Sequence, residues 1–186
     1  MVTEFLVKPE EALERLIEGN KRYISSRGSV GDISPERRSE TVSDGQHPYA
    51  IIVSCSDSRV IPEVIFSAGI GDLFVIRIAG NVIDDHQLGS IEYAAEHLGA
   101  GLLVILAHDH CGAVDAALHH EQEGYIKFIT DEIERAIGDE RDEYKACCLN
   151  AEHSKKVIEE SLRIQSSKLK VMTAIYRLES GAVEFF

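Results

Sequence analysis

Basic residues are scarce in this chain. It carries 19 Lys and Arg against 32 Asp and Glu, a formal net charge of −13 and a pI near 5.0. The few basic residues are scattered along the sequence, whereas binding to nucleic acid or to an anionic membrane surface needs a basic face. The charge therefore argues against both kinds of partner.

Long apolar runs are also missing, since no stretch approaches the roughly 20 apolar residues of a membrane span. The first 15 residues are acidic and amphipathic, which is not the pattern of a signal peptide. With 186 residues, 44% apolar and 27% charged, the composition is typical of one soluble globular domain. We expect a single domain over 1–186, with an N-terminal helical arm and connection (1–48) before an α/β core (49–186).

Cysteine is limited to four residues, and two of them are neighbours. A bridge between Cys147 and Cys148 would be strained far from ordinary disulfide geometry, so we interpret them as two thiols on a helix. The other two, Cys55 and Cys111, each follow an apolar run by a few residues at most. This usage is typical of a reducing compartment and predicts a cytoplasmic protein.

Apolar periodicity predicts alternating strands and helices. Strands separated by helices form right-handed βαβ units. We therefore predict an α/β fold with a central, mainly parallel sheet of four parallel strands plus a short C-terminal antiparallel strand, flanked by helices, with an extended N-terminal helix. The expected helices are 9 to about 26, 62–68, 87–98, 112–120, 125–137 and 150–165, the expected strands are 49–54, 73–78, 102–107, 169–176 and 182–186, and 28–48 is expected to be a surface connection.

Three metal-ligating residues stand at the ends of two of these strands. Cys55 directly follows strand 49–54, and His108 directly follows strand 102–107, with Cys111 three residues further on. Sites in open parallel sheets form at the carboxyl ends of neighbouring strands, so the three side chains should meet if these strands are adjacent. A Cys₂His set suits zinc, and three protein ligands leave a fourth position open, as in catalytic sites. The pattern predicts one Zn²⁺ per chain and a hydrolase or hydratase.

These motifs resemble those of the β-class carbonic anhydrases, in the same order along the chain. The resemblance covers nearly the whole sequence and is weakest between about 119 and 149. The matching segments are GNKRY (19–23), CSDSRV (55–60), GDLFV (71–75), AGN (79–81), GSIEYA (89–94), HxxCGAV (108–114, with positions 109 and 110 unspecified) and YRLESG (176–181).

The resemblance implies the reversible hydration of CO₂ to bicarbonate and a proton at zinc held by Cys55, His108 and Cys111. It also implies a dyad in which Asp57 accepts a hydrogen bond from zinc-bound water, and orients the attacking hydroxide, while Arg59 keeps Asp57 ionised. In the closed form known in the family, Asp57 itself becomes a metal ligand.

A substrate pocket is implied in the same way. Gln46 matches a glutamine that donates to substrate in the plant-like, open-site members, Phe74, Ala79 and Tyr93 match the pocket wall, and the backbone N–H of Gly112 matches a substrate contact. In the family the glutamine and part of the wall come from the partner subunit. The resemblance thus implies a homodimer or a dimer-based higher oligomer.

Two departures from the family are evident. Ala107 replaces the glycine that usually precedes the ligand histidine. Members with an inhibitory bicarbonate site have a tryptophan three residues before the first cysteine, where this chain has Ile52 and no tryptophan anywhere. This argues against that regulation, although Arg77 matches the arginine of the site.

Other interpretations remain open at this stage. Cys55 and Cys111 could each be a buried core thiol, and Asp57 with Arg59 could be only an ion pair at a strand end. A carbonyl sulfide or carbon disulfide hydrolase would use the same zinc ligands, and a non-catalytic zinc-binding module would use the same fold. His110 is either a proton shuttle or, as we favour, an ordinary exposed or neighbouring imidazole.

Overall fold

The structure is a computed structural model that describes residues 6–25, 31–121, 123–161 and 169–186. Its centre is one five-stranded sheet in the order β2-β1-β3-β4-β5. The first four strands are mutually parallel, and the last runs antiparallel to β4, which confirms the predicted fold class. The strands are β1 (Ala50–Ser54), β2 (Leu73–Arg77), β3 (Leu102–His108), β4 (Lys170–Tyr176) and β5 (Val183–Phe185).

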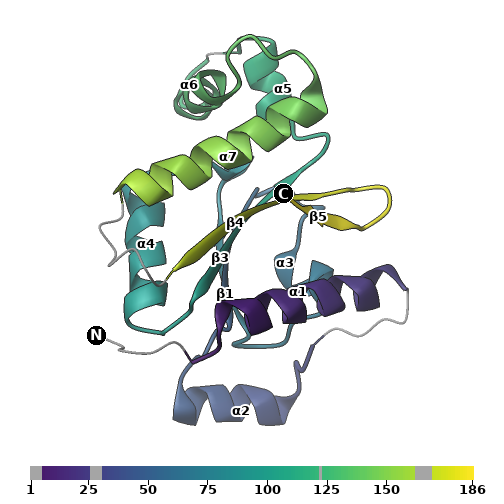
Figure 1. Cartoon of the computed structure of the whole chain (residues 1–186), viewed down its shortest axis with the longest axis vertical. Helices are drawn as coiled ribbons and strands as arrows, with labels where there is room; N and C mark the ends of the chain where they lie inside the picture. The colour runs from purple at the N-terminus through teal and green to yellow at the C-terminus, as the bar shows by residue number, and fades with distance from the viewer. Residues whose placement is uncertain (1–5, 26–30, 122, 162–168) are drawn as a thin grey trace.

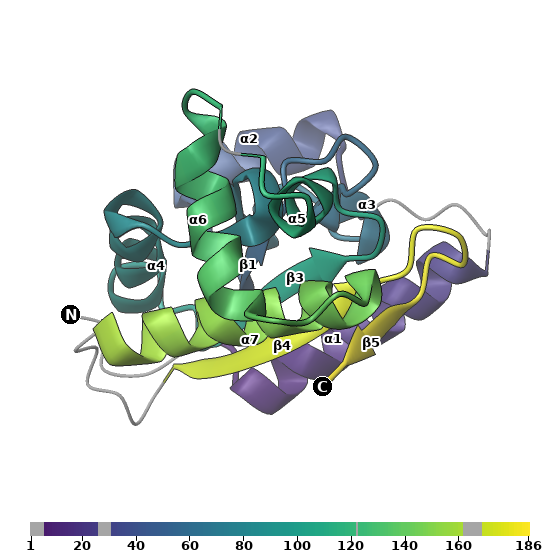
Figure 2. The same ribbon diagram turned by 90° about the horizontal axis from the view of Figure 1, so that it is seen from above.

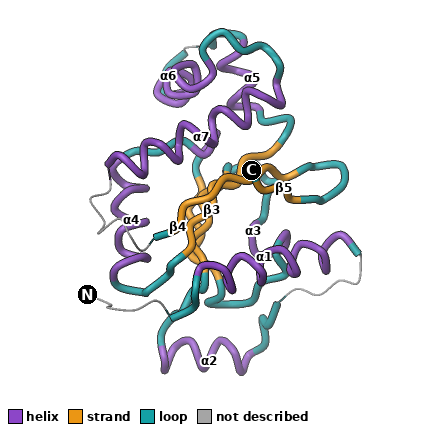
Figure 3. The backbone as a smooth tube through the Cα atoms, in the orientation of Figure 1, coloured by secondary structure: helices purple, strands orange, loops and turns teal. Residues whose placement is uncertain are grey.

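Helices cover both faces of this sheet, whose strands are drawn in orange in Figure 3. Figure 1 shows α1 and α2 below the sheet and α4, α5, α6 and α7 on its other side. The helices are α1 (Pro9–Ile24), α2 (Pro35–Asp44), α3 (Pro62–Ile65), α4 (Asp85–Glu96), α5 (Gly112–Leu118), α6 (Ile126–Ile137) and α7 (Glu143–Ser161), with a 3-10 turn η1 (Ala79–Asn81). Among the described residues, no helix is both long and apolar enough to cross a membrane.

The two central strands are buried on both faces, as expected for parallel strands between helices. Successive side chains of a strand point to opposite faces. Ile51 and Leu103 therefore pack in the core under α4 to α7, whereas Ile52 and Val104 pack in the core against α1 and α3. Cys55 belongs to the first of these cores, so its thiol faces the α4–α7 side.

The helix α1 is docked on its own sheet and runs beneath β4 and β5 (Figure 2). Leu16 is fully buried, and Asn20 donates to the carbonyl of Gly181 (2.9 Å) while accepting from the N–H of Val183 (3.0 Å). Gly19 allows the close approach, because a Cβ there would lie 1.9 Å from the carbonyl oxygen of Phe66. The apolar stripe of α1 is thus largely satisfied within one chain.

The prediction of an irregular connection over 28–48 is wrong for much of that range, because α2 lies within it. Its signal is local: Ser34 accepts from the N–H of Arg37 as N-cap, and Pro35 occupies the first turn. None of its residues is buried, so it has no apolar periodicity for a sequence pattern to detect. Residues 26–30 lie outside the described part of the chain.

Several boundaries also differ from those expected: α3 ends at Ile65 rather than at 68, and α4 spans Asp85–Glu96 rather than 87–98. The helix α7 begins at Glu143 rather than at 150, and its expected last residues, 162–165, lie outside the described residues. β3 extends to His108, so this ligand is the last residue of its strand rather than the first residue after it. The backbone pairing of His108 with Tyr176 in β4 accounts for the extension.

Candidate metal centre

Three predicted ligands come together at the carboxyl ends of β1 and β3. The two strands are neighbours, with Ser54 opposite Leu106, as the metal-site prediction required. Cys55, His108 and Cys111 are all buried, and their ligand atoms lie within 4.8 Å of one another. The two sulfurs are 4.0 Å apart. Residues 53 positions apart in the sequence thus form one compact Cys₂His cluster that can hold a metal ion.

His108 is oriented for a role as ligand. Its Nδ1 lies 2.7 Å from the carbonyl oxygen of Asp109, an acceptor, so Nδ1 carries the proton and Nε2 presents its lone pair to the cluster. Nε2 is buried and has no hydrogen-bond partner. A buried polar atom without a partner is costly, and a metal ion removes that cost. The cluster therefore fits a metal ion for two reasons. Its donor atoms are two sulfurs and an imidazole nitrogen, and the buried Nε2 of His108 has no hydrogen-bond partner.

Asp109 is a supporting residue that the sequence patterns did not indicate. Its carboxylate accepts from the N–H of Leu178 (2.8 Å) and from Arg177 (3.0 Å), while its carbonyl accepts from His108. These bonds tie the segment after β3 to the segment after β4 and fix the orientation of the imidazole. Asp109 stands between two predicted ligands at a position that the family motif leaves unspecified, and no spacing rule indicates its partners.

The environment of Cys55 favours its thiolate form. The hydrogen bond between the two sulfurs lowers the pKa of Cys55 to about 4 and raises the pKa of Cys111. Backbone N–H groups of Asp57 (3.4 Å) and Gly80 (3.3 Å) also donate to the Cys55 sulfur. Because a metal ion binds both sulfurs as thiolates, metal binding would release the thiol proton.

Asp57 and Arg59 form a bidentate ion pair beside the cluster. Arg59 donates from Nε to Oδ1 (2.9 Å) and from Nη2 to Oδ2 (2.7 Å), and its Nη2 also donates to the carbonyl of His110 (3.0 Å). The hydrogen bonds from Arg59 lower the pKa of Asp57 to about 2. Oδ2 lies 3.9 Å from Nε2 of His108, so the carboxylate stands next to the ligand atoms while bound to Arg59.

The structure shows the surroundings of Arg77 and His110, two residues whose roles the sequence left open. Arg77 donates to the carbonyls of Asp57 (2.8 Å) and Cys55 (3.3 Å), and so braces the backbone that carries the first ligand and the dyad. The His110 side chain is 71% exposed, with its Nδ1 3.4 Å from Glu143. This exposure agrees with the ordinary imidazole that we favoured.

The predicted pocket residues are only partly assembled in one chain. The rings of Phe74 and Tyr93 pack together with centroids 6.2 Å apart, and Tyr93 is still 47% exposed. Ala79 is adjacent to the residue that donates to Cys55, and Gly112 follows Cys111 as the first residue of α5. Gln46 is exposed and has no hydrogen bond to the cluster within the described residues.

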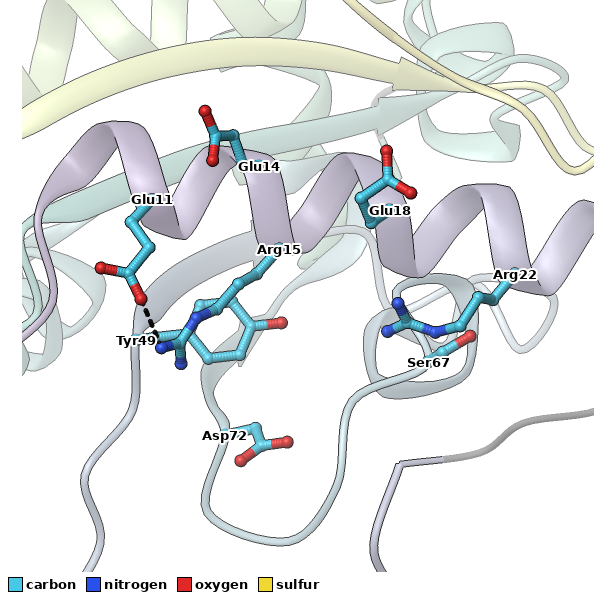
Figure 4. Close-up of a pocket in the computed structure, with 8 residues that line it drawn as sticks. All are labelled: Glu11, Glu14, Arg15, Glu18, Arg22, Tyr49, Ser67 and Asp72. Atoms are coloured by element: carbon cyan, nitrogen blue, oxygen red, sulfur yellow. Dashed lines mark hydrogen bonds and ion pairs between the residues drawn. The ribbon is translucent and has the colours of Figure 1, made fainter.

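A cavity of about 430 Å³ lies elsewhere, between α1 and the segments that flank β1 and β2 (Figure 4). Its lining shares no residue with the metal centre, and its carboxylates outnumber its guanidinium groups. Arg15 is already paired with Glu11 (2.6 Å) and stacks over Tyr49. We therefore assign this cavity no part in the chemistry of the metal cluster. The lining residues are Glu11, Glu14, Arg15, Glu18, Arg22, Tyr49, Ser67 and Asp72.

Comparison with known proteins identifies the family. A family model described as carbonic anhydrase matches residues 50–183, which include all three predicted ligands and the Asp57–Arg59 pair. The chain belongs to the β-class carbonic anhydrases. "Carbonic anhydrase 2" of Mycobacterium tuberculosis is 45% identical over 129 residues, and the carbonic anhydrase of Mycolicibacterium smegmatis is 43% identical over the same length. Each alignment covers 68% of this chain and 62% of the relative, so the chain spans less than two thirds of these relatives.

Solved structures of β-carbonic anhydrases share the fold. The β-carbonic anhydrase CcaA is 29% identical with a TM-score of 0.71, over 95% of this chain and 92% of that chain. One of two tetrameric β-carbonic anhydrases from Sordaria macrospora is 25% identical with a TM-score of 0.68, over 82% of this chain and 87% of that chain. The family resemblance inferred from the motifs is thereby confirmed.

Proposed function

We propose that this protein is a zinc-dependent carbonic anhydrase that interconverts CO₂ and bicarbonate. The observation that carries the proposal is the buried Cys55–His108–Cys111 cluster, with the unpartnered Nε2 of His108 aimed into it. Membership of the β-class carbonic anhydrases and the activity named for the M. tuberculosis relative support the same reaction.

Cys55, His108 and Cys111 are the proposed zinc ligands, one ion per chain. A zinc ion there would supply a Lewis acid with one open position, which lowers the pKa of a bound water. Two thiolates cancel the ion's formal charge, so a nearby proton acceptor is more useful here than beside neutral imidazoles.

Asp57 is the proposed acceptor. Its carboxylate stays ionised because Arg59 lowers its pKa to about 2, and its Oδ2 lies beside the ligand atoms. Arg59 fixes its direction through two parallel hydrogen bonds, and Arg77 holds the backbone of the same residue. If the hydrogen bonds from Arg59 were broken, the same carboxylate would be close enough to become a fourth metal ligand.

Substrate would sit against the apolar wall made by Phe74, Ala79 and Tyr93. CO₂ is linear and nonpolar, and negative charge develops on its oxygens only as bicarbonate forms. The N–H of Gly112 and the side-chain amide of Gln46 are proposed as donors to those oxygens. Because Gln46 makes no hydrogen bond to the cluster within the described part of its own chain, we propose that it acts from the partner subunit, as the family resemblance implies.

The decisive test is a stopped-flow assay of CO₂ hydration on zinc-loaded protein, run in parallel with an assay of carbonyl sulfide and carbon disulfide turnover. We expect rapid CO₂ hydration and little turnover of the sulfur compounds. Turnover of a sulfur compound alone would instead favour the alternative hydrolase. Stoichiometric zinc without either activity would favour the non-catalytic module.

We also propose that the active unit is at least a homodimer. α2 buries none of its residues within the chain, Val42 is 87% exposed on it, and β2 is an edge strand of the sheet. Such a surface would be covered by a second copy, which could also bring its Gln46 to the pocket.

Sedimentation velocity at micromolar concentration should give a mass at least twice 20.6 kDa. Replacing the exposed Val42 by glutamate should weaken association, because it buries a charge at the proposed contact. A wild-type monomer with full activity would refute the proposal. The proposed contact does not include α1, because this helix is docked on its own sheet.

A further inference from the structure

The buried face of α7 carries three polar side chains that the metal centre does not use as ligands. Cys147, Asn150 and Ser154 are spaced three and four residues apart, so they share one side of the helix. They are only 1%, 1% and 2% exposed, in a core made otherwise of apolar residues. Burying polar groups is costly unless they are hydrogen-bonded, so their partners are informative.

Two of these side chains hold the turn η1 (Ala79–Asn81). Asn150 donates from Nδ2 to the carbonyl of Gly80 (2.7 Å), and Ser154 donates to the carbonyl of Asn81 (2.9 Å). Both bonds are buried and join segments 70 or more positions apart in the sequence.

The backbone of this turn is unusual. Gly80 and Asn81 both have left-handed φ angles, +65° and +46°, a conformation that glycine adopts freely and asparagine more readily than most other residues. The turn is also tightly packed, since a Cβ on Gly80 would lie 2.8 Å from Cδ1 of Ile133. Contacts from α6 and α7 therefore determine where the peptide groups of Gly80 point.

The other side of Gly80 contacts the metal centre. Its N–H donates to the sulfur of Cys55 at 3.3 Å, while its C=O accepts from Asn150. Gly80 is thus held between a proposed zinc ligand and α7. The same helix packs in the core that contains the second thiol ligand, because Cys147 and Cys111 belong to one buried cluster.

We propose that Asn150 is a positioning residue for the metal centre, which acts through Gly80 to keep a hydrogen-bond donor on the Cys55 sulfur. This inference rests on the zinc site proposed above. A hydrogen bond from an N–H to a thiolate withdraws charge from sulfur and fixes its direction, and such outer contacts usually change metal affinity or activity by about 10- to 100-fold. Ser154 assists from the next turn of the helix.

The test compares Asn150→Leu with Ile158→Val. Leucine has a similar size but cannot donate to Gly80, whereas Ile158 is buried on the same helix and contacts the core rather than the turn. Zinc affinity is measured by competition with a chelator. The cobalt-substituted proteins are compared by their thiolate-to-metal absorption in the near ultraviolet, which reports directly on the sulfur ligands.

Asn150→Leu should lower zinc affinity about 10- to 100-fold and shift the thiolate absorption, whereas Ile158→Val should change neither. Wild-type affinity and spectrum in a folded Asn150→Leu protein would overturn the proposal. If Asn150→Leu fails to fold, the same two measurements are made on Ser154→Ala. A smaller loss of zinc affinity with a smaller shift in thiolate absorption supports the inference. An unchanged spectrum and affinity overturn it. Absence of thiolate absorption in the cobalt-substituted wild type would overturn the zinc site itself, a failure distinct from that of Asn150.

Discussion

Replacing Arg59 by alanine should reduce CO₂ hydration by roughly 100-fold or more while zinc stays bound. Arg59 provides two side-chain hydrogen bonds that hold the Asp57 carboxylate in place beside the ligand atoms, with Oδ2 3.9 Å from Nε2 of His108. Without the Arg59 side chain, only the backbone N–H of residue 59 would still donate to Oδ1, so Oδ2 would be released to occupy the metal position. Zinc content, by elemental analysis, and stopped-flow activity are measured on the same sample.

The double variant Asp57→Ala/Arg59→Ala separates this mechanism from a general loss of structure. If Asp57 blocks the metal in Arg59→Ala, binding of a small anion such as azide should be weak in that variant and should return in the double variant. Arg15→Ala is a matched control, because Arg15 forms an exposed ion pair with Glu11 far from the cluster and should leave activity unchanged. Full activity in folded, zinc-loaded Arg59→Ala would contradict the proposed role of the dyad.

Replacing Cys111 by alanine should eliminate zinc binding. The change removes one of three ligands and leaves the buried Nε2 of His108 beside a single sulfur. Elemental analysis should give close to one zinc per wild-type chain and close to none for the variant. Unchanged zinc content in Cys111→Ala would contradict the ligand assignment.

The free energy of unfolding should depend on whether zinc is bound. Zinc that binds only the folded state at about 1,000 times its Kd adds about 4 kcal/mol to the free energy of unfolding. The wild type should therefore lose stability on treatment with a chelator, and apo Cys111→Ala should show no further loss. Cys148→Ala is the matched control: this half-buried thiol is not a ligand, so the variant should keep both its zinc and its chelator response. A wild type whose unfolding is unaffected by chelation would contradict a metal role in folding.

Part of this architecture could be predicted from local sequence. The runs that became β1 and β3 are apolar because both faces of these strands are buried, and Cys55 and Cys111 directly follow or lie just beyond them. The order of strands and helices predicted a parallel sheet, and adjacent parallel strands bring the carboxyl ends of distant segments together. The sequence therefore predicted the cluster of Cys55, His108 and Cys111 on the condition that β1 and β3 are neighbours, which the structure shows them to be.

Sequence patterns failed where the stabilising contacts are local but not periodic. α2 depends on the Ser34 cap and on Pro35, and it buries no side chain, so an analysis of apolar periodicity did not find it. Its existence nevertheless followed from capping chemistry that is visible in the sequence.

Tertiary structure alone decided how the ligands are supported. The bonds from Asn150 to Gly80, and from Gly80 to Cys55, join three segments whose spacing carries no periodic signal. The same is true of Asp109, whose partners lie after β4. The sequence by itself therefore predicted the fold class and the three residues of the cluster, because these depend on residue type and on strand order, whereas the pairing of Asp57 with Arg59 was implied by the family resemblance. The direction of each N–H and carboxylate depends on side chains brought together only by packing, and only the folded chain could decide it.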